Sequence, residues 1–435
     1  MDMEFERVVK TEISPQNNTD AGFSFANGNP NMVFVAASQM GMMDLQSLRL
    51  NATLSVTDSN GDTPNNNNLK GGGARAYEID AYSGLGSIIK QINISRSDGT
   101  QIESIRNYNQ MLKMLAVVHS EGDYNTVAQN KFGVSPYVKV ANSSINQKQD
   151  ISLELMSGVL AMSKLYPLHT MDLQISIELS TDTNVFFGAN ASANTPTYTL
   201  TDVTMSYDVF VPNEAGREII EQDNEGQFSY NTLTSLYSIT ESSDSTTDYN
   251  LNAGRVRSVF TSLVPTSYLN TYTQNGLKMT RLENNASETT LDAVSFKRNG
   301  VNYPYDEELR VEPSSLSKRP ETAVVKEFIN SVIDYGSQKY TLMRLNNVTQ
   351  ELTANEELDV EGNSANIVKG VSSQAVYGIG VNMDDVTDVG IDMKNSSFSQ
   401  RIQSGLDGSK AMSMFSNVLA RNDVIYDNNE ISVVS

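Results

Sequence analysis

The sequence contains no cysteine and no tryptophan, and only two histidines in 435 residues. The lack of cysteine excludes disulfide bonds, thiol catalysis and zinc sites built from thiolates. Large secreted β proteins often carry disulfides, so their absence favours assembly in a reducing compartment. The histidines, His119 and His169, lie in different strand-like regions. Because a catalytic triad needs a base beside its nucleophile, we assign both histidines to loops or packing.

Positive charge is also scarce. The chain has 31 Lys and Arg residues against 52 Asp and Glu residues, which gives a net charge of −21. Binding to nucleic acid by counterion release needs clustered Lys and Arg, and the sequence has no basic run of that kind. The first ten residues carry three acidic and two basic side chains, so there is no basic arm. We therefore expect no direct sequence-specific binding of nucleic acid.

Long apolar runs are missing as well. No stretch approaches the ~18 apolar residues that a transmembrane helix needs. The N-terminus lacks the charged and then apolar pattern of a signal peptide. We expect a protein that is soluble when made, and the sequence makes no prediction about contact with a membrane.

The signatures of common enzymes are absent. Residues 405–410 resemble a P-loop only in composition, because the four-residue gap between the glycines is missing. The glycines at 71–73 are not followed by a convincing helix, which excludes a dinucleotide-binding turn. Among 52 carboxylates, no pair can be singled out as a glycosidase pair. We therefore assign no catalytic, cofactor-binding or metal-binding residue.

Two acidic turns are the remaining candidates for a small ligand. Asp58, Asn60 and Asp62 place oxygen atoms at alternating positions, as a calcium loop would. However, the glycine comes one place too early and no bidentate Glu closes the loop. Residues 383–388 form the second acidic turn. We interpret both as solvated loops.

The clearest positive signal is alternation of apolar and polar side chains. Residues 173–179 put four aliphatic side chains on one face of a strand, and residues 203–211 repeat the pattern. Such a strand has one face on a core and one face in water. Other strand-like segments are separated by turn-rich residues such as 58–61, 65–68 and 188–196, and the whole indicates an all-β chain. These segments cover residues 32–37, 45–56, 88–94, 137–140 and 151–155, and later 228–230, 277–281, 294–297, 308–311, 340–345, 367–371, 375–381 and 431–434.

Three segments show helical spacing. Thr100 and Glu103 form a capping-box pattern, which predicts a helix that starts there and continues to about residue 118. Residues 323–336 predict a second amphipathic helix. Residues 410–419 are a third candidate, either a helix before the last strands or a contact between subunits. Its apolar side chains are assigned to the core, and they are Met412, Phe415, Val418 and Leu419.

The two halves of the chain share one plan. In each half, several strands precede one amphipathic helix and several strands follow it, which is a repeat of architecture without close repetition of sequence. A chain of 435 residues is too long for one ordinary core. Pro212 follows the strand at 203–211, and proline ends ladder pairing. We therefore divide the chain into residues 1–212 and 213–435.

Three groups of residues resemble one known family in their order along the chain. A glycine turn is followed by an I-E-x-I-x-x-Y-N run, an L-x-S-G-x-L passage leads to P-L before the strand at 173–179, and a glycine-containing strand, loop and strand occurs late. Together they resemble double jelly-roll major capsid proteins, particularly those of polinton-like viruses and virophages. The matching residues are Ile102, Glu103, Ile105, Tyr108 and Asn109, then Leu155, Ser157, Gly158, Leu160, Pro167 and Leu168, and then Gly378, Gly380, Val381, Met383, Gly390 and Ile391, with a terminal strand in residues 421–435.

The resemblance implies two tandem eight-stranded antiparallel jelly rolls with a few short helices in the connections. It implies homotrimeric, pseudo-hexameric capsomers that tile an icosahedral shell around a DNA genome, without enzymatic activity. Implied partners are further copies of the chain and the penton and minor capsid proteins, and the implied location is the virion, after assembly inside the host cell. Residues 65–68 and 242–248 would suit outer loops. Since tryptophan is absent, Met and Tyr must fill the core volumes that it occupies in related proteins.

Two other classes of function remain open. A carbohydrate-binding or adhesin-type β-sandwich would usually show aromatic platforms or calcium loops, whereas here the tyrosines are scattered. A hydrolase on a β scaffold would need turnover that depends on His119 or His169. We favour the capsid interpretation over both.

Overall fold

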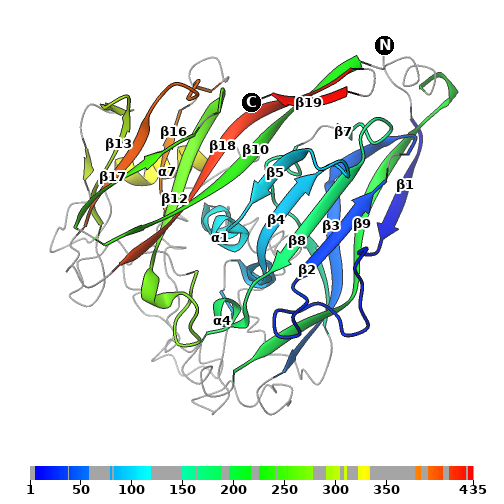
Figure 1. Ribbon diagram of the computed structural model, residues 1–435, viewed down its shortest axis with the longest axis horizontal. Coiled ribbons are helices and arrows are strands. Elements are labelled where there is room, and N and C mark those ends of the chain that lie inside the picture. Colours follow the sequence, from blue (N-terminus) through cyan, green and yellow to red (C-terminus); the bar gives the residue numbers. More distant parts are fainter. Residues whose placement is uncertain are drawn as a thin grey trace.

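Strands dominate the computed structural model of the chain (Figure 1). Within the part of the chain that it describes, no helix is both long and apolar enough to cross a membrane. The described residues are 5–37, 39–57, 79–80, 83–118, 149–162, 165–187, 195–216, 225–241, 243–251, 253–277, 291–303, 308–310, 322–333, 378–383, 390–404, 411–427 and 430–434.

Eight strands of the first half form two four-stranded arrays, ordered β1-β9-β3-β6 and β2-β8-β4-β5. Counted along the chain, these orders are 1-8-3-6 and 2-7-4-5, so the first strand lies beside the last. One further strand of two residues, β7 (Leu165–Tyr166), pairs with β3. The eight strands are β1 (Phe5–Ile13), β2 (Asn31–Ala36), β3 (Met42–Thr57), β4 (Ile89–Ser95), β5 (Gln101–Ile105), β6 (Gln149–Glu154), β8 (Leu173–Leu179) and β9 (Thr197–Pro212).

The second half repeats this topology. Its arrays are β10-β18-β12-β16 and β11-β17-β13-β14, which again read 1-8-3-6 and 2-7-4-5. The repeat of architecture predicted from the sequence is therefore confirmed. Two short strands are added, β15 (Leu309–Arg310) on β13 and β19 (Glu430–Val434) on β18. The eight strands are β10 (Glu225–Thr240), β11 (Asp244–Tyr249), β12 (Val256–Pro265), β13 (Leu291–Arg298), β14 (Val301–Tyr303), β16 (Ile379–Asn382), β17 (Phe398–Ser404) and β18 (Met412–Asp427).

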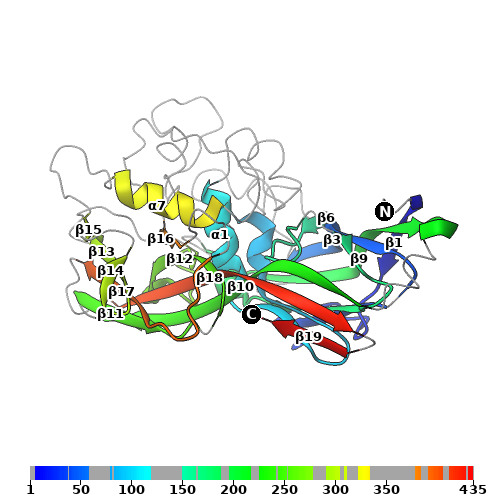
Figure 2. The ribbon, with the colours of Figure 1, turned by 90° about the horizontal axis from the view of Figure 1, so that it is seen from above.

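The two helices α1 (Tyr108–Val118) and α7 (Thr322–Ile333) occupy the same topological position, between the fifth and sixth strands of their halves. Figure 2 shows both helices on the same side of β10, β12 and β18. Helix α7 packs closely on β16, where a Cβ atom at Gly380 would lie 2.0 Å from the Ser331 hydroxyl oxygen. Any larger residue at position 380 would push the helix off the sheet.

The two halves share one continuous sheet. Strand β5 of the first half runs parallel to β10 of the second, and Ser104 is opposite Thr234. This contact joins two arrays into a nine-stranded sheet ordered β16-β12-β18-β10-β5-β4-β8-β2, with β19 attached to β18. We call the contact between β5 and β10, with the residues around it, the seam.

The burial of each strand explains whether its sequence pattern predicts it. Strand β8 alternates as predicted, with Leu173, Ile175, Ile177 and Leu179 buried. Strand β12 is buried on both faces along nearly its whole length, because helix α7 packs against it in addition to the strands of its own half. A strand covered on both sides has no polar face, so its alternation is lost.

Three predictions about local structure are wrong. Thr100 and Glu103 do not start a helix, because residues 101–105 form strand β5 and helix α1 begins only at Tyr108. Residues 410–419 are not helical either, since β18 pairs with β10 over the full length of that strand. The ladder overrides the helical spacing of the sequence. Residues 244–249 form strand β11 on β17 rather than an outer loop.

Of the remaining predictions, some are confirmed, and others fall outside the described residues. Helix α7 confirms the prediction at 323–336, and Met412, Phe415, Val418 and Leu419 are buried as core residues. Six strands were not predicted at all, namely β1, β7, β11, β12, β14 and β17. The strands predicted at 137–140, 340–345 and 367–371, the loop at 65–68 and most of the strand at 277–281 lie outside the described residues.

Candidate functional site

The described residues contain no group of three or more His, Asp or Glu side chains placed to hold a metal ion. His169 is half-buried in the turn after β7. The other polar candidates of the sequence lie outside the described residues, so the structure does not place them. They are His119, the acidic turn with Asp58, Asn60 and Asp62, most of the acidic turn at 383–388, and residues 71–73 and 405–410. The most developed polar cluster is instead at the seam.

Glu103 on β5 is the centre of the seam. Its side chain is buried, with 2% of the residue exposed. Oε1 accepts hydrogen bonds from the backbone N–H of Gly158 at 2.8 Å and of Leu233 at 2.6 Å. Oε2 accepts one from Val159 N–H at 3.2 Å. One carboxyl group therefore joins β5, the turn after β6 and strand β10 of the other half.

Burial raises the pKa of Glu103 to about 7, although hydrogen bonds from Ser157 and from the three backbone N–H groups act in the opposite direction. A buried carboxyl group with a pKa near neutrality is a candidate general acid or base. Here both oxygen atoms already bind backbone N–H groups, and the side chain has almost no exposed surface. The arrangement is suited to holding segments together rather than to proton transfer with a substrate.

Gly158 lets these segments approach one another. A Cβ atom at this position would lie 2.6 Å from the Asn231 carbonyl oxygen on β10 and 2.7 Å from Oε1 of Glu103. Only glycine leaves room for both. Two of the three passages that carry the family resemblance, those around Glu103 and around Gly158, therefore meet at the seam.

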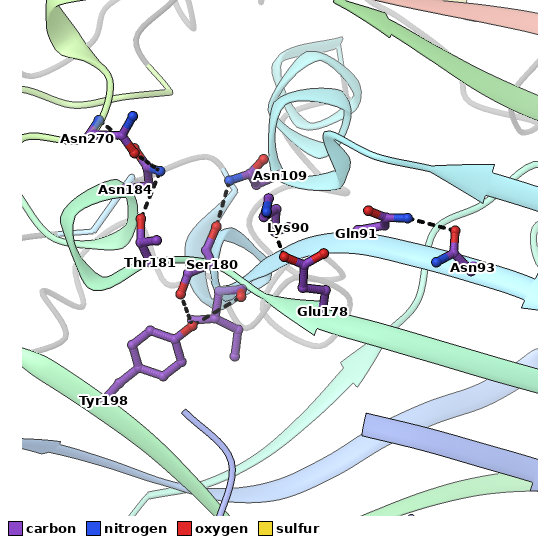
Figure 3. A network of polar contacts seen from close by, with 11 residues as sticks. Lys90, Gln91, Asn93, Asn109, Glu178, Ser180, Thr181, Asn184, Tyr198 and Asn270 are labelled. Atoms are coloured by element: carbon purple, nitrogen blue, oxygen red, sulfur yellow. Dashed lines mark hydrogen bonds and ion pairs between the residues drawn. The ribbon is translucent and has the colours of Figure 1, made fainter. Parts of the chain in front are cut away.

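Helix α1 is fixed by the residues that follow Glu103 in the same passage. The Tyr108 hydroxyl oxygen accepts a hydrogen bond from Met156 N–H at 2.8 Å. Asn109 donates through Nδ2 to the Ser180 hydroxyl at 3.2 Å, and the Tyr198 hydroxyl of β9 donates to the Ser180 carbonyl oxygen at 2.6 Å (Figure 3). The start of α1 is thus tied to the ends of β6 and β8.

A buried ion pair anchors the middle of α1. Lys113 Nζ lies 2.5 Å from Asp80 Oδ2, and the two side chains are 0% and 2% exposed. Asp80 also accepts hydrogen bonds from Ser83 and from Asn275 Nδ2, the latter at 2.8 Å. Burial alone would raise the pKa of Asp80, but the Lys113 charge and these donors outweigh it and hold that pKa below its ordinary value.

Asn275 belongs to a segment of the second half, residues 266–277, that reaches back to the first half. We call it the strap. Gln110 of α1 donates to the Gly276 carbonyl oxygen at 2.7 Å. Asn184 and Asn270 exchange two hydrogen bonds, at 2.8 Å and 3.0 Å, the second of which is visible in Figure 3. The strap and the β5–β10 contact together fix one half against the other.

Sequence reasoning found Glu103 and Gly158 through the family resemblance and assigned Glu103 to a helix cap. It did not name the seam residues of β10, such as Asn231 and Leu233. It missed the Asp80–Lys113 pair. One signal was available, because Lys113 interrupts the apolar run Met111-Leu112-Lys113-Met114-Leu115. A charged residue on the buried side of a helix calls for a partner of opposite charge.

Comparison with solved structures identifies the architecture. The PBCV-1 virus capsid aligns with a TM-score of 0.59 at 8% identity, over 100% of this chain and 98% of that one. The Faustovirus major capsid protein gives 0.57 at 9% identity, over 97% and 90%. The mavirus major capsid protein gives 0.51 at 10% identity, over 98% and 89%.

This chain is a double jelly roll. The alignments run through both halves, and the 1-8-3-6 and 2-7-4-5 orders of each half are those of a jelly roll. The predicted fold, two tandem jelly rolls with short helices in the connections, is confirmed. No family model and no curated protein matches the sequence. The likeness to the capsid proteins is therefore one of fold, at 8–10% identity.

Proposed function

We propose that this double jelly roll is a major capsid protein that assembles as a homotrimeric, pseudo-hexameric capsomer of an icosahedral viral shell around a DNA genome. The observation that supports this most is the repeat itself. Two jelly rolls of the same strand order stand in one chain, and virus capsid proteins match the chain over nearly its full length. Three such chains would supply six jelly rolls, which suits sixfold packing in a shell.

The polar clusters of the structure support a structural role rather than an enzymatic one. Glu103 and the Asp80–Lys113 pair are closed to solvent and bind backbone or side-chain partners within the chain. We propose jelly-roll boundaries at residues 1–212 and 213–435, with the end of β9 at Pro212 as support. Neighbouring capsomers and the penton and minor capsid proteins are the proposed partners, and the virion is the proposed location.

The test is the state of the purified full chain in solution. Light scattering should give a mass three times that of the 47.7 kDa chain, and negative-stain microscopy should show particles of pseudo-hexagonal outline. A chain that remains monomeric at all concentrations would contradict the proposal. Binding to a glycan array by such a monomer would favour the adhesin alternative.

A further inference from the structure

Three side chains from distant parts of the chain meet at one oxygen atom beside helix α1. Oδ2 of Asp80 lies 2.5 Å from Nζ of Lys113 and accepts a hydrogen bond from Nδ2 of Asn275 at 2.8 Å. Asp80 and Lys113 belong to the first jelly roll, whereas Asn275 belongs to the strap of the second. An amine and a carboxamide from the two halves are therefore held against the same carboxyl group.

The cluster is almost closed to water, which favours the uncharged forms of its amine and its acid. The side chains of Lys113 and Asp80 are 0% and 2% exposed. Buried apolar residues adjoin the cluster in the sequence, namely Leu112, Met114 and Leu277. Burial disfavours the charged forms of both groups, and an ion pair held away from water carries a desolvation cost. Transfer of one proton from Nζ to Oδ2 along their contact gives a neutral amine, which is the nucleophilic form of lysine.

Asn275 presents its carboxamide in a form suited to attack by an amine. Its Oδ1 accepts a hydrogen bond from the Leu277 backbone N–H at 2.9 Å. A donor at this oxygen atom stabilises the negative charge that develops on it when a nucleophile adds to the carbonyl carbon. Its Nδ2 faces Asp80, so the nitrogen atom that must leave is next to a group that can give it a proton. The amine, the carboxyl group and the polarised amide are the parts that an acyl transfer needs.

We propose that Lys113 and Asn275 react to form an isopeptide bond between helix α1 and the strap, with Asp80 as general base and acid. Lys113 first gives one proton to Asp80, and its neutral Nζ then adds to Cγ of Asn275. Asp80 passes its proton to Nδ2 and takes a second proton from Nζ as the bond between Cγ and Nδ2 breaks. Nδ2 leaves as ammonia, Nζ stays bonded to Cγ, and Asp80 ends protonated, so the product holds no buried charge. The ion pair of Asp80 and Lys113 is the state before this reaction.

The bond gives the chain a covalent link that its lack of cysteine otherwise denies it. It joins residue 113 of the first jelly roll to residue 275 of the second, and a cross-link of this kind stabilises a fold by restricting the unfolded chain. An amide bond, unlike a disulfide, also persists in a reducing compartment. The inference concerns the chain itself and does not depend on the proposed capsid role, so either one can fail alone.

Mass spectrometry of the purified full chain tests the bond directly. The intact chain should be lighter than its sequence mass by one ammonia. Trypsin digestion of the denatured chain should release residues 107–131 and 258–278 as one linked species, because an acylated Lys113 is no longer a cleavage site. A folded chain of full sequence mass, or a free peptide that ends at Lys113, would overturn the proposal. Deamidation of Asn275, which makes the chain heavier, would also overturn it, because water or the Gly276 nitrogen atom would then be the nucleophile.

Variants separate the roles of the side chains. Lys113→Arg keeps a cation beside Asp80 but cannot attack, because a guanidinium does not lose its proton. Asp80→Asn removes the proton acceptor, and both variants should give unlinked peptides at full mass. Lys90→Arg is the matched control, since Lys90 pairs with Glu178 at a partly exposed site, and it should leave the link intact.

Circular dichroism establishes that each variant is folded. A link that survives Lys113→Arg or Asp80→Asn in a folded chain would contradict the proposed chemistry. Mass is the deciding readout, because a loss of stability on changing Lys113 would follow from loss of the ion pair as well as from loss of the bond.

Discussion

The seam depends on a few buried polar side chains whose partners come from distant parts of the sequence. Glu103 receives N–H groups from residues 55, 56 and 130 positions away. A buried acceptor that loses its donors destabilises the fold, because its desolvation free energy is no longer offset by hydrogen bonds. Such a cluster therefore favours one arrangement of the two jelly rolls over others. The single residues of this cluster are therefore the most sensitive positions to change.

Gly158→Ala should destabilise the protein by about 1–3 kcal/mol, because the added methyl group would overlap the Asn231 carbonyl oxygen and the Glu103 carboxyl group. Urea unfolding measures the loss. Gly276→Ala in the strap is the control, since its nearest neighbours would lie at 3.3 and 3.4 Å and should yield with a smaller loss. Equal losses in both variants would contradict the close approach at Gly158.

Glu103 should make stability depend on pH. The pKa of Glu103 is about 7 in the folded protein against an ordinary value of 4.5. Between these values the folded state holds a proton that the unfolded state has lost, so the free energy of unfolding should fall as pH rises from about 4.5 to 7, by up to about 3 kcal/mol. The stabilisation is fully present below this window and is lost above it.

The comparison between the unmodified chain and Glu103→Gln isolates this group, because burial also raises the pKa of Asp182, to about 6. The variant should be less stable at low pH, because its amide NH2 group replaces one of the two oxygen atoms that accept backbone N–H groups. It should also have a flatter dependence on pH, because glutamine does not titrate. Chemical unfolding at half-unit steps of pH measures both curves. Parallel curves would show that Glu103 does not titrate in this window.

Among the structural elements, helix α1 has side-chain contacts with both jelly rolls. Its Lys113 faces Asp80 of the first jelly roll, and its Gln110 binds the strap of the second. The corresponding helix α7 packs instead on the glycine strand β16. The same topological position is therefore used once to join the halves and once to cover a sheet.

Removal of the α1 anchor should be costly. Lys113→Met leaves the buried Asp80 carboxylate without its cation, and we expect a loss of about 3–5 kcal/mol in urea unfolding. Lys90→Met is the matched control, because Lys90 forms a comparably short ion pair with Glu178 that is partly exposed. That change should cost no more than about 1 kcal/mol. Similar losses in the two variants would show that burial of the Lys113 pair is not what matters.

The strands and helices also differ in whether the sequence alone predicts them. Strands with one wet face, such as β8, and the amphipathic helix α7 were predicted from spacing alone. Strand β12 was missed because both of its faces are buried, and β18 was taken for a helix because its buried residues also fit a spacing of three and four. Glu103 matches a capping box locally, but its partners lie far away in sequence, and local spacing carries no information about them.

At the scale of the whole molecule, charge should control assembly beyond the capsomer. Each chain carries a net charge of −21, so the proposed capsomers should repel one another at low ionic strength. The Debye length falls from about 10 Å at 0.1 M salt to about 3 Å at 1 M. Larger particles should therefore form more readily as NaCl or a divalent cation is added, as followed by light scattering. Assembly that is indifferent to ionic strength would contradict this role of the charge.

The pairing of β1 with β9 has a consequence for the way the chain is made. Val9 pairs with Val209, 200 residues further along the chain. At a synthesis rate of roughly 5–20 residues per second, β1 leaves the ribosome about 10–40 s before its partner exists. Throughout that interval the β1 strand, with its exposed valines, is open to the wrong strand of its own chain or of a neighbour on the same messenger. Correct folding of the first jelly roll is therefore a problem of timing, and we expect nascent chains to depend on a chaperone until β9 has emerged.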